Sequence, residues 1–208
     1  MKTVTGYWFA PENKKLAHGD GRKIKIGITH KIKGEIIPCI HGLHLSKRPI
    51  DALIYAPGPV VYKVEGSGII IPHGNPVDKY ACSERTYIAG GYDCTEPLRL
   101  FARKCALDVI HLWNAPDVVI RYLKTGNEKI RDAAWDAAGD AAGAAAWAAA
   151  WAAAWAAAWA AAWAAARAAA GAAARDAAGD AAGAAARAAY INKANRRLTA
   201  MLSKYLKL

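Results

Sequence analysis

Histidine and cysteine side chains, residue types that commonly bind zinc, gather at one place in the first hundred residues. His41 and His44 closely follow Cys39, and Cys82 lies further along the chain. Four such donors can form a tetrahedral zinc site. Side chains three positions apart on a β-strand point to opposite faces, however, which separates the two imidazoles. We therefore interpret the histidines as strand-end residues that bond to backbone or solvent, and we predict no metal and no cofactor.

Basic side chains accumulate towards the end of the chain. The chain carries 28 Lys and Arg against 17 Asp and Glu, a net charge of +11, yet residues 96–186 are electrically balanced. Residues 187–208 hold only basic charges, and such a segment can bind nucleic acid or an acidic membrane surface. The residues that would contact nucleic acid are Lys193, Arg196, Arg197 and Lys204.

The same segment has the pattern of an ordinary packing helix. Its apolar residues share one helical face, so we predict an amphipathic helix over residues 190–208 whose charges are its solvated side. The apolar residues are Leu198, Met201, Leu202, Tyr205 and Leu206. Nucleic-acid binding is therefore an alternative function and not the leading one.

A small domain of strands would position the histidines and cysteines. Alternation with period two, as in residues 24–28, predicts half-buried strands joined by turns. Ser46 is expected to cap a short helix with Pro49 in its first turn. Gly66-Ser67-Gly68 lacks the lysine of a phosphate-binding P-loop, so we predict a turn there. The expected strands are residues 3–9, 24–28, 35–45, 60–65, 68–71 and 79–88.

A glycine pair, Gly90-Gly91, marks the end of this domain. Thr95 is expected to cap the first of several helices, and Gly126 to close a later one. The predicted fold class is therefore α+β. A mainly antiparallel sheet is expected in residues 1–94, and an all-helical region in residues 95–208.

The helical region contains a four-residue repeat written almost wholly in alanine, from residue 131 to residue 189. Alanine is the best helix former, so the repeat is predicted to be helical. Each step of four residues advances about 400° around the helix, so the rings at the variable position form a slow spiral. These rings, predicted to pack inside the chain or against another copy, are Trp147, Trp151, Trp155, Trp159 and Trp163.

The uncharged stretch from Ala141 to Ala166 is long enough to cross a bilayer. Alanine contributes little to membrane insertion, and tryptophan prefers the membrane interface to its centre. The same register also continues into Arg and Asp on both sides. We therefore predict no membrane span.

Two resemblances cover most of the chain. Residues 24–88, through "CIHGLHLSKRPIDALIYAPGPVVYKVEGSG" and "DKYACSERTYI", resemble an uncharacterised α+β domain of tailed-phage and bacterial proteins. Residues 97–208, through "PLRLFARKCALDVIHLW" and "VIRYLKTGNEKIRDAAWDAAGDAAGAAAWAAAW", are similar to an alanine-rich helical region of the kind labelled immunity protein. The first resemblance implies a phage or prophage origin, and neither implies an established activity.

A looser similarity suggests an enzyme as the second alternative. The order of strands and short helix is similar to ADP-ribosyltransferase folds, which use NAD. That similarity implies roles for Ser46 and Tyr55 at the centre of the site and for Glu84 on a late strand. The first strand lacks the expected Arg or His, and the Glu/Gln-x-Glu doublet is missing. A surface pair of Glu84 and Arg85 accounts for these residues equally well.

The cysteines and the start of the chain bear on its compartment. The four cysteines show no close CxxC spacing, and the start lacks the apolar core of a signal peptide. We expect free thiols in a reducing cytoplasm, that of the host if the chain is phage-encoded. The leading hypothesis is a non-enzymatic interaction or scaffold protein that binds an unknown protein partner or another copy of itself.

Overall fold

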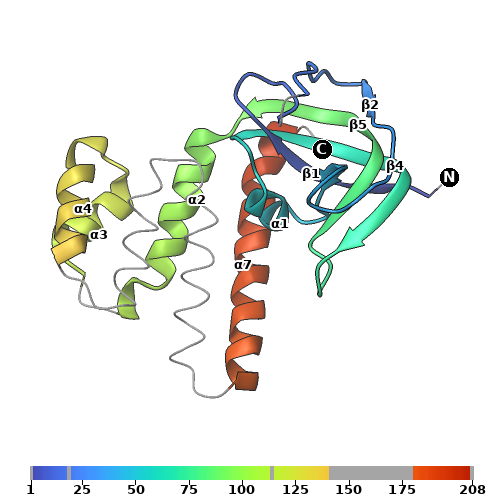
Figure 1. The fold of residues 1–208 in the computed structure, drawn as a ribbon. Helices are drawn as coiled ribbons and strands as arrows, with labels where there is room; N and C mark the ends of the chain where they lie inside the picture. The colour runs from blue at the N-terminus through green and yellow to red at the C-terminus, as the bar shows by residue number, and fades with distance from the viewer. Residues whose placement is uncertain (1, 18–19, 113–114, 141–179, 207–208) are drawn as a thin grey trace. The chain divides into compact units, whose positions relative to one another are not determined.

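The computed structural model describes residues 2–17, 20–112, 115–140 and 180–206 (Figure 1). The chain divides into two compact units. The first comprises residues 1–95 together with 198–208, and the second comprises residues 96–197. Each unit is described by itself below.

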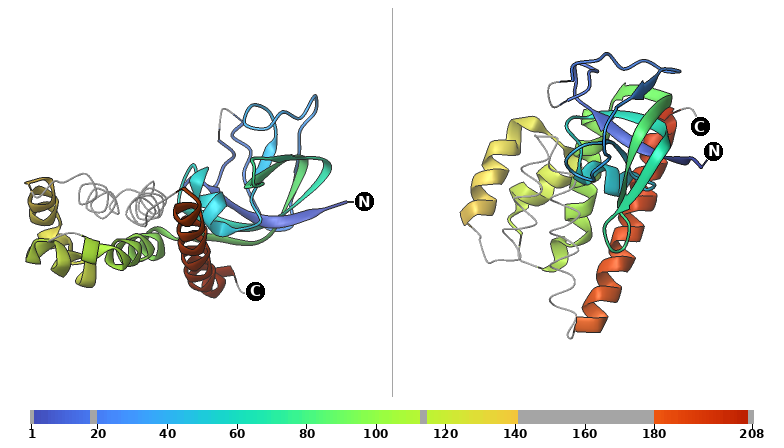
Figure 2. Two further views of the ribbon diagram at one scale, coloured as in Figure 1. Left: turned by 90° about the horizontal axis from the view of Figure 1, so that it is seen from below. Right: turned by 45° about the vertical axis from the view of Figure 1, so that its right-hand side comes forward.

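The first unit is built on a five-stranded antiparallel sheet, and the predicted α+β class is confirmed. The strand order is β1-β4-β5-β2, and β3 also pairs with β5. The long strands β4 and β5 run side by side and bend together (Figures 1 and 2). The strands are β1 (Val4–Ala10), β2 (Thr29–Lys31), β3 (Leu43–Leu45), β4 (Val60–His73) and β5 (Lys79–Asp93).

The sheet curls until its first strand meets the residue after β3. The backbone N–H of Tyr7 donates to the Ser46 carbonyl at 2.8 Å, and the Ser46 N–H donates back at 3.0 Å. A Cβ on Gly6 would overlap that Ser46 carbonyl, so this approach requires glycine. Ser46 is therefore part of the sheet and does not cap the helix. The α1 helix (Pro49–Ile54) has Arg48 at its N-cap and Pro49 at its first position.

The concave face of the sheet holds a hydrophobic core because alternate side chains of the strands point inward. Tyr62 and Val64 on β4 are almost wholly buried there, beside Tyr87 on β5. The last turns of α7 (Asp180–Leu206) also belong to this unit, where Leu206 lies against Gly90 and the ring centroids of Tyr205 and Tyr92 are 6.5 Å apart. Leu198, Leu202 and Leu206 are buried along one helical face, as predicted.

Two strand predictions and one turn prediction were wrong. Residues 24–28 form a turn in which the Ile28 N–H donates to Lys25 and Gly27 has φ of 82°, so the Lys/Ile alternation there is not a strand. Only residues 43–45 of the strand predicted at 35–45 pair with the sheet. The predicted turn at 66–68 is a bulge inside the continuous strand β4.

The described part of the second unit is helical. Ala134 and Ala138 of α4 are buried beside Tyr122 and Leu123 of α3. Gly126 ends α3 with φ of 67°, as predicted. The helices are α2 (Thr95–Asp108), η1 (Ile110–Leu112), α3 (Asp117–Thr125), η2 (Glu128–Ile130), α4 (Arg131–Asp140) and α7 (Asp180–Leu206).

Candidate functional site

A buried arginine occupies the interior of the sheet unit. Arg85 on β5 is 2% exposed, and its guanidinium lies 3.8 Å from the ring centroid of Trp8. Its Nη2 donates to the Tyr87 hydroxyl at 2.8 Å, and its Nη1 donates to the His44 carbonyl at 2.6 Å. Among the described residues, no carboxylate forms an ion pair with Arg85. The guanidinium is held by ring faces and neutral oxygens, and burial lowers its pKa.

The Tyr87 hydroxyl links this arginine to a buried histidine. It lies 3.0 Å from Nδ1 of His30, whose ring also bonds to the Lys23 backbone. Burial lowers the pKa of His30, and the positive charges of Arg22 and Arg85 lower it further. A neutral His30 can accept at Nδ1 from the Tyr87 hydroxyl, which itself accepts from Arg85. The network of Trp8, His30, Arg85 and Tyr87 is satisfied internally, which favours a structural role.

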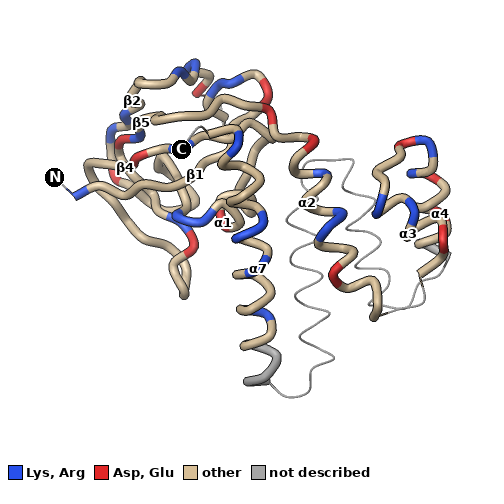
Figure 3. The backbone as a smooth tube through the Cα atoms, turned by 180° about the vertical axis from the view of Figure 1, so that it is seen from behind, with Lys and Arg blue, Asp and Glu red and all other residues tan. Residues whose placement is uncertain are grey.

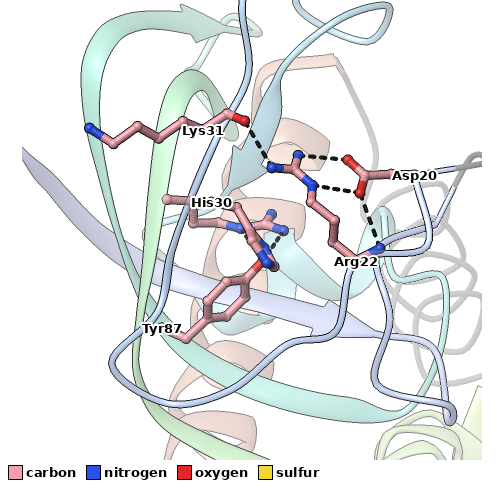
Figure 4. A network of polar contacts seen from close by, with 6 residues as sticks. Asp20, Arg22, His30, Lys31 and Tyr87 are labelled. Atoms are coloured by element: carbon pink, nitrogen blue, oxygen red, sulfur yellow. Dashed lines mark hydrogen bonds and ion pairs between the residues drawn. The ribbon is translucent and has the colours of Figure 1, made fainter.

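Outside this network, Arg22 fastens a loop to the free edge of β2 (Figure 4). Its guanidinium binds both carboxylate oxygens of Asp20 at 2.7 Å. Its third nitrogen donates to the Lys31 carbonyl at 2.9 Å. In an antiparallel ladder only alternate residues bond to the neighbouring strand through their backbones, and on β2 His30 is such a residue. The carbonyl of the next residue, Lys31, therefore faces away from the sheet, and Arg22 covers it.

The segment from Arg22 to Lys33, together with Ile88, forms a surface that we term the basic isoleucine edge. Ile26, Ile28 and Ile88 are 51%, 38% and 45% exposed. Backbone hydrogen bonds hold this segment against β5 next to Ile88: the Gly27 N–H donates to the Tyr87 carbonyl, and the Tyr87 N–H donates to the Ile28 carbonyl.

This edge is also strongly basic, and Figure 3 shows its Lys and Arg positions in blue beside β2. Arg22 and Lys31 are paired with Asp20 and Glu84. The other three basic side chains are exposed and have no ion pair with any described carboxylate. They are Lys23, Lys25 and Lys33.

A thiol and an imidazole lie close together near the start of β5, where His73 pairs with Lys79. The Sγ of Cys39 lies 3.6 Å from Nε2 of His73, and the Cys39 N–H donates to Nε2 of His44 at 3.2 Å. The Nδ1 of His41 lies 2.7 Å from the Glu35 carbonyl. The prediction that His41 and His44 bond to backbone is therefore confirmed, and no metal-binding cluster occurs among the residues the structure describes.

The three residues of the transferase alternative have separate partners. Ser46 is buried in backbone pairing with Tyr7, and the Tyr55 hydroxyl donates to Asp78 at 2.7 Å. Glu84 binds Lys31. Lys79 lies over the Tyr55 ring and next to the end of β3, so Ser46 and Tyr55 share that end of β5. Glu84 is five residues further along β5 than Lys79, which separates the two Cα atoms by about 16 Å.

The predicted surface pair of Glu84 and Arg85 was wrong, because Arg85 is buried and only Glu84 faces solvent. Sequence reasoning missed the Arg85 network and the contact between Cys39 and His73. The alternation of side chains along a strand could have indicated the Arg85 network, since Arg85 and Tyr87 share one face of β5. No local pattern joins Cys39 to His73, which lie 34 positions apart.

The predicted nucleic-acid residues divide into two pairs. Arg197 and Lys193 both bind Asp108, with Arg197 Nη1 at 2.9 Å and Lys193 Nζ at 3.3 Å. Arg196 and Lys204 are exposed. Two of the four cations therefore have a structural partner inside the protein.

The tryptophans of the repeat, from Trp147 to Trp163, lie outside the described residues. Trp135, at the start of the repeat, is 40% exposed on α4. No helix in the described ranges combines the length and apolar character needed to cross a membrane.

Comparisons with protein-family models, with curated proteins and with solved structures find no significant match to this chain. The resemblances to the phage domain and to the immunity-type helical region therefore stay predictions.

Proposed function

We propose that this chain is a non-enzymatic protein–protein interaction or scaffold protein, and that the basic isoleucine edge binds an acidic protein partner. The observation that carries this proposal is the exposure of Ile26, Ile28 and Ile88 beside unpaired lysines. The three isoleucines are about half exposed, so burying the remainder of each on binding contributes about 1 kcal/mol. Neighbouring carboxylates on a partner would accelerate encounter and fix its orientation.

The chemistry of the edge favours protein over nucleic acid. Single-stranded nucleic acid is held by exposed aromatic rings on which bases stack, whereas Trp8 and Tyr87 pack within the core of the unit. Duplex interfaces are dominated by positive and polar groups, and the exposed isoleucines of the edge would have no apolar counterpart there. A protein surface of mixed acidic and apolar character matches both components.

The repeat would supply the scaffold. At its described start, Ala134 and Ala138 face the core of their unit, whereas Trp135 is substantially exposed. We infer that the exposed ring of Trp135 serves as an anchor for assembly.

Binding of a purified partner tests the proposal. Proteins captured by the full chain would be identified, purified and titrated by calorimetry against the wild type and the I26S/I28S variant. The matched control is I40S, because Ile40 is 79% exposed and follows Cys39, at the other end of β5. We expect the dissociation constant to rise about tenfold or more in I26S/I28S and to stay unchanged in I40S.

Two outcomes contradict the proposal. The first is a purified partner that binds both variants as well as it binds the wild type. The second is tight binding of random-sequence RNA or duplex DNA, with steep salt dependence and no effect of I26S/I28S. The second result would assign the lysines of the edge to phosphate contacts.

A further inference from the structure

Cys39 differs from the other three cysteines of the chain in being exposed. Burial raises the pKa of Cys82 to about 11 and that of Cys94 to about 12, and it also raises the pKa of Cys105. These three thiols are protonated near neutral pH and shielded from reagents. Because the thiolate is the reactive form of cysteine, chemistry at sulfur is confined to Cys39.

A general base lies beside this thiol. The Nε2 of His73 is 3.6 Å from the Cys39 Sγ, and His73 ends β4, where it pairs with Lys79. An imidazole in this position can accept the thiol proton and stabilise the thiolate as an ion pair. His73 comes from β4 and Cys39 from a loop, so the contact is tertiary and is specific to the folded protein.

The loop that carries Cys39 is held in place from two sides. Ile37 and His41 exchange backbone hydrogen bonds, both of 2.8 Å, which closes the loop on either side of the cysteine. Cys39 itself has φ of 70°, a conformation that a non-glycine residue keeps only when its surroundings hold it. The bond from its N–H to His44 provides such a restraint.

The backbone near the sulfur restricts the chemistry. The N–H groups of Cys39, Ile40 and His41 already donate, the first to His44 and the other two to the Ile37 carbonyl. No pair of these donors remains to stabilise the oxyanion of an acyl-transfer reaction. Thiol–disulfide exchange develops charge on sulfur and needs no oxyanion hole.

We propose that Cys39 and His73 form a site of reversible S-thiolation by low-molecular-weight disulfides. The Cys39 proton moves to His73 Nε2, and the Sγ lone pair forms a bond to one sulfur of the disulfide. The bond between the two disulfide sulfurs breaks, and the leaving sulfur takes its electron pair and receives the proton from His73. Cys39 is thereby oxidised to a mixed disulfide, and one half of the reagent is reduced to a thiol.

The test uses the reduced full-length protein and oxidised glutathione as the probe. Mass spectrometry of the intact chain and its peptides locates the adduct, and rate constants are measured from pH 5.5 to 9. The variants are C39S, H73Q and H41Q, the last because His41 belongs to the same loop but bonds to Glu35 instead of the thiol. The titratable groups near Cys39 are His73, His44 and Tyr55, and Tyr55 is bonded to Asp78.

We expect one dithiothreitol-reversible adduct at Cys39, with a rate constant at pH 7 that falls about tenfold or more in H73Q. H41Q should keep the wild-type rate. Adduct formation at another cysteine, equal rates in wild type and H73Q, or equal slowing by H41Q would overturn the proposal. If H73Q does not fold, H73N is measured in its place, and a rate equal to that of the wild type overturns the proposal.

Discussion

Asp108 and Arg197 form a bidentate ion pair, with N–O distances of 2.9 and 3.2 Å, although 89 positions separate them in the sequence. The pair joins α2 to α7 within the second unit. Lys193 binds the same carboxylate at 3.3 Å, and the Tyr190 hydroxyl donates to the Cys105 carbonyl at 3.1 Å. Polar contacts thus connect α2, at the start of the helical unit, to α7.

Replacing Asp108 by Asn should weaken this connection. The variant removes the charge from a partly buried, doubly bonded carboxylate, so we expect the free energy of unfolding to fall by about 1–3 kcal/mol. Urea unfolding followed by circular dichroism measures the change. The control is E96Q, because the Glu96 side chain is 75% exposed in its pair with Arg99 and should contribute under about 1 kcal/mol. Equal losses in the two variants would contradict the assigned role of Asp108.

Local sequence patterns predicted the class of the fold well. Inward-facing residues such as Tyr62 and Val64 follow strand alternation, and the spacing of Leu198, Leu202 and Leu206 predicted a buried helical face. The sequence did not reveal that this face belongs to the sheet unit, because helical periodicity shows which side is apolar but not what covers it.

The candidate sites were harder to predict because they depend on pairing between strands. The Lys/Ile alternation around Ile26 has the form of a half-buried strand, yet Gly27 adopts a left-handed conformation and turns the chain. Ile26 and Ile28 are therefore exposed, whereas Ile24 is buried. Arginine is usually found at the protein surface, and only the inward direction of position 85 on β5 places this side chain beside Trp8.

Stability should depend on the protonation of His30. Burial and nearby positive charges lower its pKa in the folded state below the ordinary 6.5. The unfolded chain therefore binds the proton more readily, so this contribution is complete above pH 6.5 and is lost as pH falls toward the folded-state pKa. We expect the urea midpoint to decline from pH 7.5 to 5, and to decline less in H30Q.

The matched control for this experiment is H111Q, because His111 is exposed. That variant should retain the wild-type slope. The role of His30 would be refuted if H30Q and wild type showed the same decline.

Arg85 should contribute strongly to stability through both stacking and hydrogen bonding. R85A leaves a cavity beside Trp8 and removes the donors to Tyr87 and His44, so we expect a loss of about 3–5 kcal/mol. R85M refills much of the volume without a buried charge and should lose less, about 1–3 kcal/mol. Urea unfolding of both variants provides the comparison. Losses below about 1 kcal/mol in both would show that the network is not stabilising.

Arg22 should limit self-association more than it stabilises the fold. Its pair with Asp20 is partly exposed, so R22A should change the free energy of unfolding by no more than about 1 kcal/mol. The same change uncovers the Lys31 carbonyl on the free edge of β2, and open strand edges pair with other chains. We expect light scattering on a sizing column to show a larger average mass for R22A than for wild type as concentration rises.

R131A is the matched control, because Arg131 also forms an exposed ion pair, with Glu128, but covers no strand edge. It should scatter like wild type at every concentration. If R22A also scattered like wild type, the Lys31 carbonyl would be protected by something other than Arg22. If R131A associated as strongly as R22A, loss of positive charge, and not exposure of the edge, would explain the association.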